Sequence, residues 1–398
     1  MNGPKPRHAR LASSLAAAVL ALCACANAAG QPTPAPLTSV GPGEGALRLL
    51  GVSGYVEDGS VDPRVDWASA FAHRTGCRVN FTRVTTVNAL SAAVKLRGAG
   101  YYDGVVAPPV VAGKLIGAGA IAPLNVGLIG GYAAISPALR EQPAVTAHGE
   151  TYGLPYLWSS YQLGYRPQSV RQTPRTWASV FDRRSASSYP GKILLPDTPL
   201  TIGLAALYLK TARPSLRISD PYELTSQQFA AVTSLLMNLR SRGVSYYSQD
   251  SDAIYGLAAG STALGAVLPR LVDTLARAGR KVAGVDPAEG TTGSVNFWLM
   301  NARAHHPNCM YEWLAWSITP RVQSQAAKWT GTAPVNAAAC DALGRQICGL
   351  GPIVDRAYLD KVGFAHMPGP DCGNGNRACV GWTRWTHTWA SIVRAAPG

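Results

Sequence analysis

The chain has 398 residues, and its 36 lysines and arginines outnumber its 22 aspartates and glutamates, which gives a formal net charge of +14. The basic residues are scattered rather than clustered among aromatic side chains, and no zinc-finger spacing occurs, which argues against nucleic-acid binding. A basic surface of this kind suits a protein that works beside an anionic envelope.

The N-terminus carries the pattern of an export signal. Three basic residues precede a short apolar block, Leu11–Leu22, and an A-x-A cleavage motif follows at residues 26–28. A membrane-spanning helix needs about 20 apolar residues, so this block is too short to anchor the chain by itself. We therefore expect residues 1–28 to form a signal peptide. The alternative is a lipoprotein signal that ends before Cys25, because the sequence LCAC is similar to a lipobox and would make Cys25 the acylated residue.

Residues 29–45 are rich in proline and glycine and lack apolar periodicity, so we expect a flexible tether. The folded part should begin at Ala46. About 350 residues then remain, which is too many for one ordinary core and favours two lobes. No later apolar run is long enough to cross a bilayer.

Six cysteines follow the leader, and an even number in an exported chain indicates disulfides. Short loops cost the least entropy to close, which favours Cys340–Cys348 and Cys372–Cys379 among the fifteen pairings that six cysteines allow. Elimination leaves Cys77–Cys309. No metal site is indicated, since the chain has no C-x-x-C motif and the histidines before Cys309 lack ligand spacing.

Strands and helices alternate along the chain, a pattern typical of parallel α/β sheets. The first part predicts, in chain order, strand Leu47–Val52, helix Pro63–Thr75, strand Cys77–Thr82, helix Val87–Leu96, strand Tyr102–Val106 and helix Val111–Ala118. The middle predicts an extended segment Thr151–Tyr165, helix Trp177–Phe181, strand Lys192–Leu195, helices Thr201–Lys210, Thr225–Arg240 and Ala253–Ala259, strand Ala263–Leu268, helix Leu271–Ala278 and strand Lys281–Val285. The last part predicts a further segment Phe297–Ala302 and helices Pro307–Thr319, Arg321–Trp329 and Thr383–Arg394.

This order places a second α/β unit inside the first. We expect lobe 1 to comprise residues 46–155 and 290–398 and lobe 2 to comprise residues 156–289, joined by two chain crossings. Ligands of open α/β sheets bind at the carboxyl ends of the strands, so two such lobes that face each other form a cleft that a hinge can close.

Several segments stand in a family-specific order: WASAFAHRTGCRVN, GYYD, YGLPYLW at Tyr152–Trp158, EGTTGSVNFWLM and HPNCMYEWLAW. In this order they resemble the periplasmic spermidine/putrescine-binding proteins of ABC transporters, over essentially all of Ala46–Val393. The resemblance implies a two-lobe type II periplasmic binding protein fold, with a mixed or parallel sheet flanked by helices in each lobe. It also implies a periplasmic or extracytoplasmic monomer without a cofactor. Its partners would be a small-molecule solute and an ABC permease in the inner membrane, and its only contact with the membrane a possible lipid anchor.

Carrying over the family's ligand pocket gives six candidate ligand-binding residues. Polyamine sites in this family place aromatic rings along the alkyl chain and carboxylates on the ammonium groups. Tyr55 matches a pocket aromatic, Trp158 lies on the outgoing crossing strand, two acidic positions fall on Thr198 and Thr201, and the hinge-side Trp-x-Asp becomes Ser294-Val295-Asn296. Hinge packing is the alternative for Trp158, and loop capping is the alternative for the polar residues.

Two further residues near this pocket have a structural and a functional interpretation. We expect Asp197 to be structural, as a cap of the helix that begins near Thr201. Arg270 follows the segment LGAVLP, and we expect it to be exposed to solvent, with contact to an anionic ligand as the alternative.

These replacements change the expected ligand. A dication enclosed without counter-charges loses several kcal/mol of solvation per ammonium, and hydrogen bonds that return roughly 1 kcal/mol each do not offset that loss. We therefore expect a neutral polar or small anionic solute. A true polyamine binder with a rearranged pocket and a non-transport binding or sensory paralogue are the alternatives. We do not expect an enzyme, because the chain has no G-x-S-x-G elbow, P-loop or H-E-x-x-H motif and no carboxylate pair at catalytic spacing.

Overall fold

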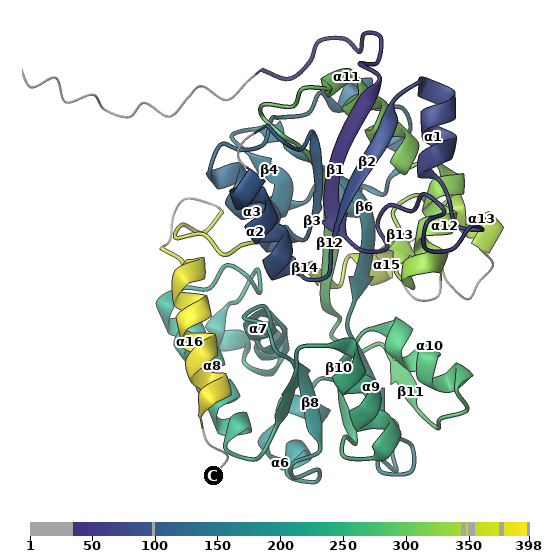
Figure 1. Cartoon of the computed structure of the whole chain (residues 1–398). Coiled ribbons are helices and arrows are strands. Elements are labelled where there is room, and N and C mark those ends of the chain that lie inside the picture. The colour runs from purple at the N-terminus through teal and green to yellow at the C-terminus, as the bar shows by residue number, and fades with distance from the viewer. Residues whose placement is uncertain (1–34, 98–99, 344–347, 349–354, 374–377, 396–398) are drawn as a thin grey trace, which may run out of the picture. The chain divides into compact units, whose positions relative to one another are not determined.

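The computed structural model describes residues 35–97, 100–343, 348, 355–373 and 378–395 (Figure 1). The predicted signal peptide, Cys25 and the first part of the predicted tether lie outside these residues. The described chain contains two main β-sheets, each packed into its own hydrophobic core.

The lobe 1 sheet is mixed and has the strand order β13-β6-β12-β3-β1-β2, with β14 paired to β12. Its strands are β1 (Ala46–Val52), β2 (Arg78–Val84), β3 (Gly104–Ala107), β6 (Gly153–Ser160), β12 (Thr291–Met300), β13 (Ala333–Pro334) and β14 (Val362–Phe364). Strands β2, β1 and β3 are parallel, whereas β12 runs antiparallel to β3 and β6. The short strands β4 (Thr146–Ala147) and β5 (Glu150–Thr151) form a separate hairpin.

The α-helices of lobe 1 are α1 (Ala68–Thr75), α2 (Val87–Arg97), α3 (Pro109–Gly117), α4 (Pro137–Arg140), α11 (Pro307–Ser317), α12 (Pro320–Thr330), α13 (Ala339–Leu343) and α15 (Arg356–Leu359). Three 3-10 turns, η1 (Val126–Leu128), η2 (Tyr132–Ala134) and η3 (Pro143–Val145), lie between α3 and β4. The core is rich in aromatic rings: Trp313 packs edge-on against both Trp298 and Phe71, at ring-centroid distances of 5.7 and 5.1 Å. All four residues of β3 are buried, as expected of a strand with both faces covered.

The lobe 2 sheet has five strands in the order β11-β7-β10-β8-β9. The strands are β7 (Gln162–Tyr165), β8 (Ile193–Pro196), β9 (Ser245–Tyr247), β10 (Leu264–Val267) and β11 (Ala283–Val285). Its helices are α5 (Ala178–Phe181), α6 (Arg183–Ala186), α7 (Thr201–Ala212), η4 (Pro214–Leu216), α8 (Ser226–Arg240), α9 (Asp250–Ala259), α10 (Pro269–Arg277) and α16 (Trp382–Arg394). Helix α8 begins at a capping box formed by Thr225 and Gln228.

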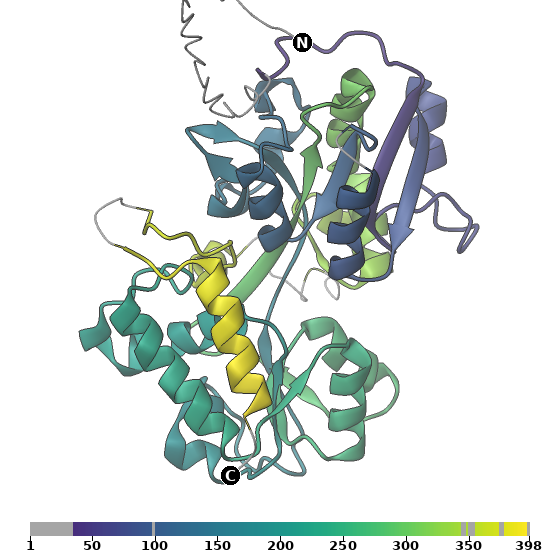
Figure 2. The same cartoon turned by 60° about the vertical axis from the view of Figure 1, so that its left-hand side comes forward.

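The C-terminal part of the chain differs from the expected division into lobes. Helix α16 buries Trp385, Trp389 and Ile392 in the core of lobe 2, although the sequence pattern places residues 290–398 in lobe 1. These three side chains recur at helical spacing and therefore share one face. Figures 1 and 2 show the yellow α16 beside α8, where Phe229 and Trp385 have ring centroids 5.7 Å apart. The chain therefore crosses between the lobes a third time, after β14.

All three predicted disulfides are present: Cys77–Cys309, Cys340–Cys348 and Cys372–Cys379. The first joins the end of α1 to α11 across 232 residues of sequence. The other two close short loops with separations of 8 and 7 residues.

The last residues of the predicted tether are held against α11. The N–H groups of Asn308 and Cys309 each donate a 2.9 Å hydrogen bond to the carboxylate of Glu44. The N–H of Gly41 donates to Asn308 Oδ1 at 2.8 Å. A carboxylate at a helix N-terminus is favourable because it faces unpaired N–H groups. Ordered contacts therefore begin before Ala46.

Candidate functional site

The candidate site is built at the carboxyl ends of strands from both sheets. Tyr55 lies in the loop after β1, Arg270 is the second residue of α10, directly after β10, and Asn296 lies within β12. Tyr161 follows β6, and Asp250 begins α9. We call these five residues the Tyr55–Arg270 cluster.

Arg270 links the two lobes. Its Nε donates a 3.1 Å hydrogen bond to Asp250 Oδ2, and the two side chains form an ion pair that leaves 29% of the arginine and 41% of the aspartate side chain exposed. Arg270 also faces Gly331, the residue that ends α12 in lobe 1, because a Cβ placed on Gly331 would lie 3.2 Å from Arg270 Cβ. Arg270 is therefore not the freely solvated side chain expected from the sequence.

Burial raises the pKa of both cluster tyrosines. The pKa of Tyr55 rises to about 12 because the phenol is desolvated, and this rise is opposed by the charge of Arg270 and by a side-chain hydrogen bond with Asn296. The pKa of Tyr161 also rises to about 12, again through desolvation, with Arg270 opposing the rise and Asp250 adding to it. Both phenols are therefore protonated at neutral pH and can donate hydrogen bonds.

Three of the predicted ligand-binding residues lie close together in lobe 1: Tyr55, Ser294 and Asn296. The Tyr55 ring lies 6.1 Å from that of Tyr156, whose hydroxyl donates to the backbone oxygen of Tyr55. Ser294 and Asn296 are two residues apart on β12 and both are half-buried, so they share one face of the strand. The cluster therefore contains two of the six candidates, Tyr55 and Asn296, and Ser294 lies beside it.

Trp158 has the alternative role of hinge packing. Its side chain is fully buried, its Nε1 donates a 3.0 Å hydrogen bond to the backbone oxygen of Pro334, and its ring packs edge-on against Phe364. The expectation that Trp158 forms a ligand wall does not agree with this environment. A fully enclosed ring with a satisfied N–H offers no surface to a solute.

Thr198 and Thr201 shape the turn that starts α7. Thr201 is buried and its hydroxyl donates a 2.7 Å hydrogen bond to the backbone oxygen of Pro196. Thr198 Oγ1 accepts the N–H of Leu200 at 3.4 Å. Both hydroxyls therefore bond to backbone groups of the loop before α7, which agrees with loop capping, the alternative to ligand binding for these residues.

The neighbouring carboxylates already have partners. Glu57 is buried, accepts the indole N–H of Trp329 at 3.2 Å and lies 3.8 Å from Arg83. Its pKa is raised because burial outweighs these interactions. Asp197 does not cap α7 as expected, because it accepts the indole N–H of Trp389 at 2.8 Å and a hydroxyl hydrogen bond from Ser248.

The sequence did not single out Tyr161 or Asp250 as pocket residues, and Arg270 was expected to be exposed to solvent, with contact to an anionic ligand as the alternative. A usable signal was present for Arg270, since it stands two residues into a helix that directly follows a buried parallel strand. In open α/β sheets this is the edge at which ligands bind.

A separate hollow lies at the hinge. Asp286, Thr291, Tyr358 and Lys361 are among its lining residues, and its volume is about 270 Å³. The pKa of Asp286 is raised by burial. This volume is slightly below the usual range of small-molecule sites, about 300–1,000 Å³, and the hollow lies between the second crossing segment and α15.

Comparison with known proteins adds a family and a fold. A family model described as "Bacterial extracellular solute-binding protein" matches residues 66–342. Among solved structures, the spermidine/putrescine substrate-binding protein PotD of Streptococcus pneumoniae has a TM-score of 0.66 at 16% identity, covering 87% of this chain and 97% of that chain.

Two further solved structures carry other solute names. The binding protein MotA of A. tumefaciens B6 in complex with glucopine gives a TM-score of 0.62 at 14% identity, covering 87% of this chain and 99% of its own. A protein described as a GABA receptor gives a TM-score of 0.61 at 19% identity, and the match covers 80% of this chain and 91% of that chain. At these identities the likeness shows the two-lobe fold alone.

The residues that the structure describes include no helix with both the length and the apolar character required to cross a membrane.

Proposed function

Because the chain belongs to the family of bacterial extracellular solute-binding proteins, we propose that it captures a small polar solute between its two lobes and passes it to an ABC permease in the inner membrane. The proposed solute is neutral and polar or a small anion. An anionic group, a carboxylate above all, is the form that Arg270 favours.

The observation that carries this proposal is the position of Arg270. Its guanidinium lies close enough to the phenols of Tyr55 and Tyr161 to influence the pKa of both. A guanidinium has five N–H donors, of which Asp250 uses only a part. The remaining donors, together with the two phenols and the Asn296 amide, form a lining that donates hydrogen bonds. Such a lining stabilises an acceptor group such as a carboxylate.

The same charges disfavour a polyamine. Asp250 is paired with Arg270, and Glu57 is occupied by Trp329 and Arg83. An ammonium in the cluster would lie near a guanidinium and would have to take Asp250 from it. Removing one partner from a buried or half-buried pair is unfavourable because the other charge is left without compensation.

The solved relatives are consistent with a fold that accommodates different solutes. Their names refer to spermidine and putrescine, GABA, and glucopine. The solute of this chain must therefore be inferred from its own residues. GABA is a useful first probe because it carries a carboxylate and an ammonium, whereas putrescine carries two ammonium groups.

The proposal also covers where the chain is located, whether it is a monomer and whether it carries a lipid. We expect a monomer outside the cytoplasmic membrane, released after residue 28 or held by a lipid on Cys25. Mass spectrometry of the mature chain distinguishes these outcomes, since acylation at Cys25 leaves a lipid-modified N-terminal peptide that cleavage after residue 28 does not.

A thermal-shift screen of the mature chain tests the solute class. The probes are GABA and other small carboxylates, neutral sugars, putrescine and spermidine. A ligand at 100 times its Kd adds about 2.7 kcal/mol to the free energy of unfolding, which gives a readable rise in Tm. We expect carboxylates or neutral polar solutes to raise the Tm. A rise with polyamines alone would favour a rearranged polyamine binder, and no rise with any probe would favour a sensory or non-transport paralogue.

A further inference from the structure

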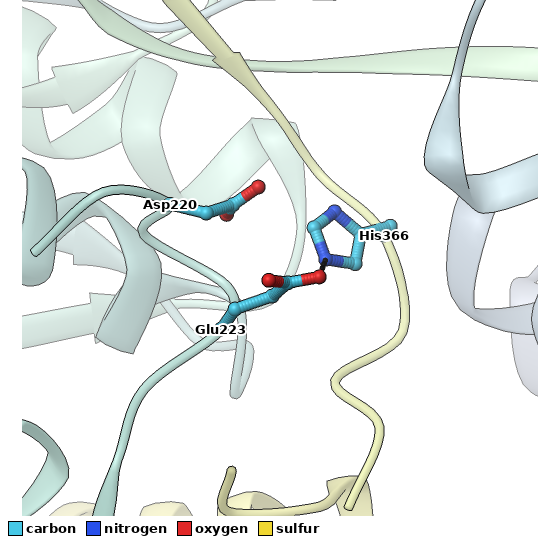
Figure 3. Close-up of side chains that lie close together, drawn as sticks. All are labelled: Asp220, Glu223 and His366. Carbon is cyan, nitrogen blue, oxygen red and sulfur yellow. Dashed lines mark ion pairs between the residues drawn. The ribbon is translucent and has the colours of Figure 1, made fainter. Parts of the chain in front are cut away.

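Three titratable side chains come together outside the solute site. Asp220 and Glu223 lie in the loop that precedes α8, and His366 lies two residues after β14 on the third crossing. Figure 3 shows the two carboxylates and the imidazole pointing toward one another from these two segments. One ligand atom from each residue lies within 4.8 Å of the others. We propose that Asp220, Glu223 and His366 bind a divalent transition-metal ion, with Zn²⁺ as the best match.

The main observation is that the imidazole of His366 is buried without hydrogen bonds among the described residues. The side chain is only 8% exposed, and neither ring nitrogen has a hydrogen-bond partner in the part of the chain that the structure describes. Nε2 points at Glu223 Oε1 but lies 3.9 Å from it, which is too far for a hydrogen bond. Buried polar groups are nearly always satisfied. A metal ion between the imidazole and the carboxylates would satisfy this nitrogen.

One oxygen of each carboxylate accepts a backbone N–H, and among the described residues the other oxygen accepts no hydrogen bond. Glu223 Oε2 accepts the N–H of Gly373 at 2.9 Å, and Asp220 Oδ1 accepts the N–H of Tyr222 at 2.7 Å. These bonds fix the orientation of both side chains, as outer contacts commonly do for metal ligands. The other oxygens of the two carboxylates are the ligand atoms that the cluster offers.

A second histidine in the chain shows the contrasting arrangement. His306 Nδ1 lies 2.8 Å from Asp103 Oδ2, and the other oxygen of Asp103 accepts the backbone N–H groups of His305 and His306. That carboxylate is used by its own neighbours and needs no ion. The His366 cluster also joins a histidine to carboxylates, but neither imidazole nitrogen has a hydrogen-bond partner among the described residues.

The donor set selects the metal. Imidazole nitrogen and carboxylate oxygen are both Zn²⁺ ligands, and three protein ligands leave a fourth position open, as in catalytic zinc sites, whereas Mg²⁺ and Ca²⁺ prefer oxygen donors alone. Ligand atoms about 2.1 Å from a tetrahedral ion stand about 3.4 Å apart, so small rotations of the half-buried carboxylates complete the site.

Sequence patterns do not reveal this site, because His366 lies far along the chain from Asp220 and Glu223. Asp220 and Glu223 come from lobe 2, whereas His366 is positioned from lobe 1, since the preceding Ala365 donates its N–H to the Gly293 oxygen of β12 at 2.8 Å. A bound ion would fix the third crossing to the loop before α8, close to the Cys372–Cys379 disulfide that Gly373 adjoins. The ion would thus stabilise the place at which α16 joins lobe 2.

Zinc titration of the full chain tests the proposal. The protein is stripped with EDTA, dialysed and titrated with Zn²⁺, with Co²⁺ as a visible-absorbance probe and Mg²⁺ as a hard-cation control. We expect one Zn²⁺ per chain, an absorbance band of tetrahedral Co²⁺, and a Tm that falls when EDTA is added. The variants Glu223→Gln and His366→Gln should weaken Zn²⁺ binding at least tenfold.

The control is His387→Gln, which removes an exposed histidine of α16 and should leave binding unchanged. His366 is buried and its variant can fail to fold, in which case Glu223→Gln decides, because its side chain is 26% exposed. Absence of one-equivalent binding would overturn the proposal. Unchanged binding in Glu223→Gln, or an equal loss in His387→Gln, would also overturn it.

Discussion

Lobe 1 contributes a phenol and a carboxamide to the Tyr55–Arg270 cluster, from Tyr55 and Asn296, whereas lobe 2 contributes a guanidinium and a carboxylate, from Arg270 and Asp250. Neutral hydrogen-bonding groups accept many polar ligands. A charged group discriminates, because an ion of the wrong sign suffers an uncompensated desolvation cost. We therefore propose that lobe 1 positions the solute and that lobe 2 selects its charge.

The largest effect is expected from removing the charge of lobe 2. Arg270→Gln keeps a hydrogen-bonding side chain but loses the cation, and hydrogen bonds to charged groups contribute about 1.5–3 kcal/mol. Binding of an anionic solute should therefore weaken about 10- to 100-fold by calorimetric titration. Arg277→Gln is the control, since Arg277 lies on the same helix, pairs with Asp273 and has a side chain that is 61% exposed. Equal losses in both variants would contradict the assignment of charge selection to Arg270.

A smaller effect is expected from removing an uncharged hydrogen-bonding group of lobe 1. Tyr55→Phe removes one hydroxyl and should weaken binding about 2- to 12-fold, the range that corresponds to a neutral hydrogen bond of about 0.5–1.5 kcal/mol. The matched control is Tyr255→Phe, because Tyr255 is 72% exposed on α9. If Tyr55→Phe costs more than Arg270→Gln, the division of roles between the lobes is reversed.

Closure of the two lobes can be tested at Gly331. This glycine ends α12 with φ of 65° and faces Arg270, whereas Gly76 ends α1 with φ of 77° and has open space where a Cβ would stand, with nothing within 4 Å. Gly331→Ala and Gly76→Ala should each lower the free energy of unfolding by about 1–2 kcal/mol through left-handed strain. Only Gly331→Ala should also weaken solute binding, because its methyl group meets Arg270. Equal affinities in the two variants would show that this contact is not part of the closed state.

The smallest effect concerns Glu44, which accepts backbone N–H groups at the start of α11. Burial raises its pKa, but the hydrogen bonds from Cys309 and Asn308 together outweigh burial, so the net pKa lies below the usual 4.5. A lowered pKa stabilises the folded state above pH 4.5, and this contribution is lost as the pH falls through the folded-state value.

Glu44→Gln should therefore cost less than about 1 kcal/mol at pH 7, and its difference from the wild type should shrink below about pH 4 in urea unfolding. Glu150→Gln, an exposed carboxylate of lobe 1, serves as the reference. A difference that grows on acidification would contradict the role of Glu44 at α11.

The fold was largely predictable from the sequence because its elements follow local rules. Apolar strands, glycine-ended helices and the helix predicted at Thr225–Arg240 lie within a residue or a few of their expected positions. The start of α1 was placed too early at Pro63, because Asp62 forms a turn by accepting the N–H of Arg64. The place of α16 was missed because an amphipathic helix does not specify which core it covers.

The site was less predictable than the fold. The family resemblance proposed Tyr55 and Asn296, which the structure places together, but the burial of Trp158 was not expected because it depends on β13 and β14, which come from distant parts of the chain. Arg270 was expected at the surface because a single sequence does not reveal an ion pair with Asp250. The His366 cluster depends on tertiary structure alone.

The central claim is that the Arg270 side of the cluster selects the charge of the solute. Calorimetric titration of the mature chain with small carboxylates, each paired with its own amide, and with putrescine and spermidine tests this claim most directly. We predict that a carboxylate binds at least about tenfold more tightly than its amide and that neither polyamine binds with sub-micromolar affinity. Sub-micromolar binding of spermidine or putrescine, with no preference for carboxylate over amide, would contradict the claim.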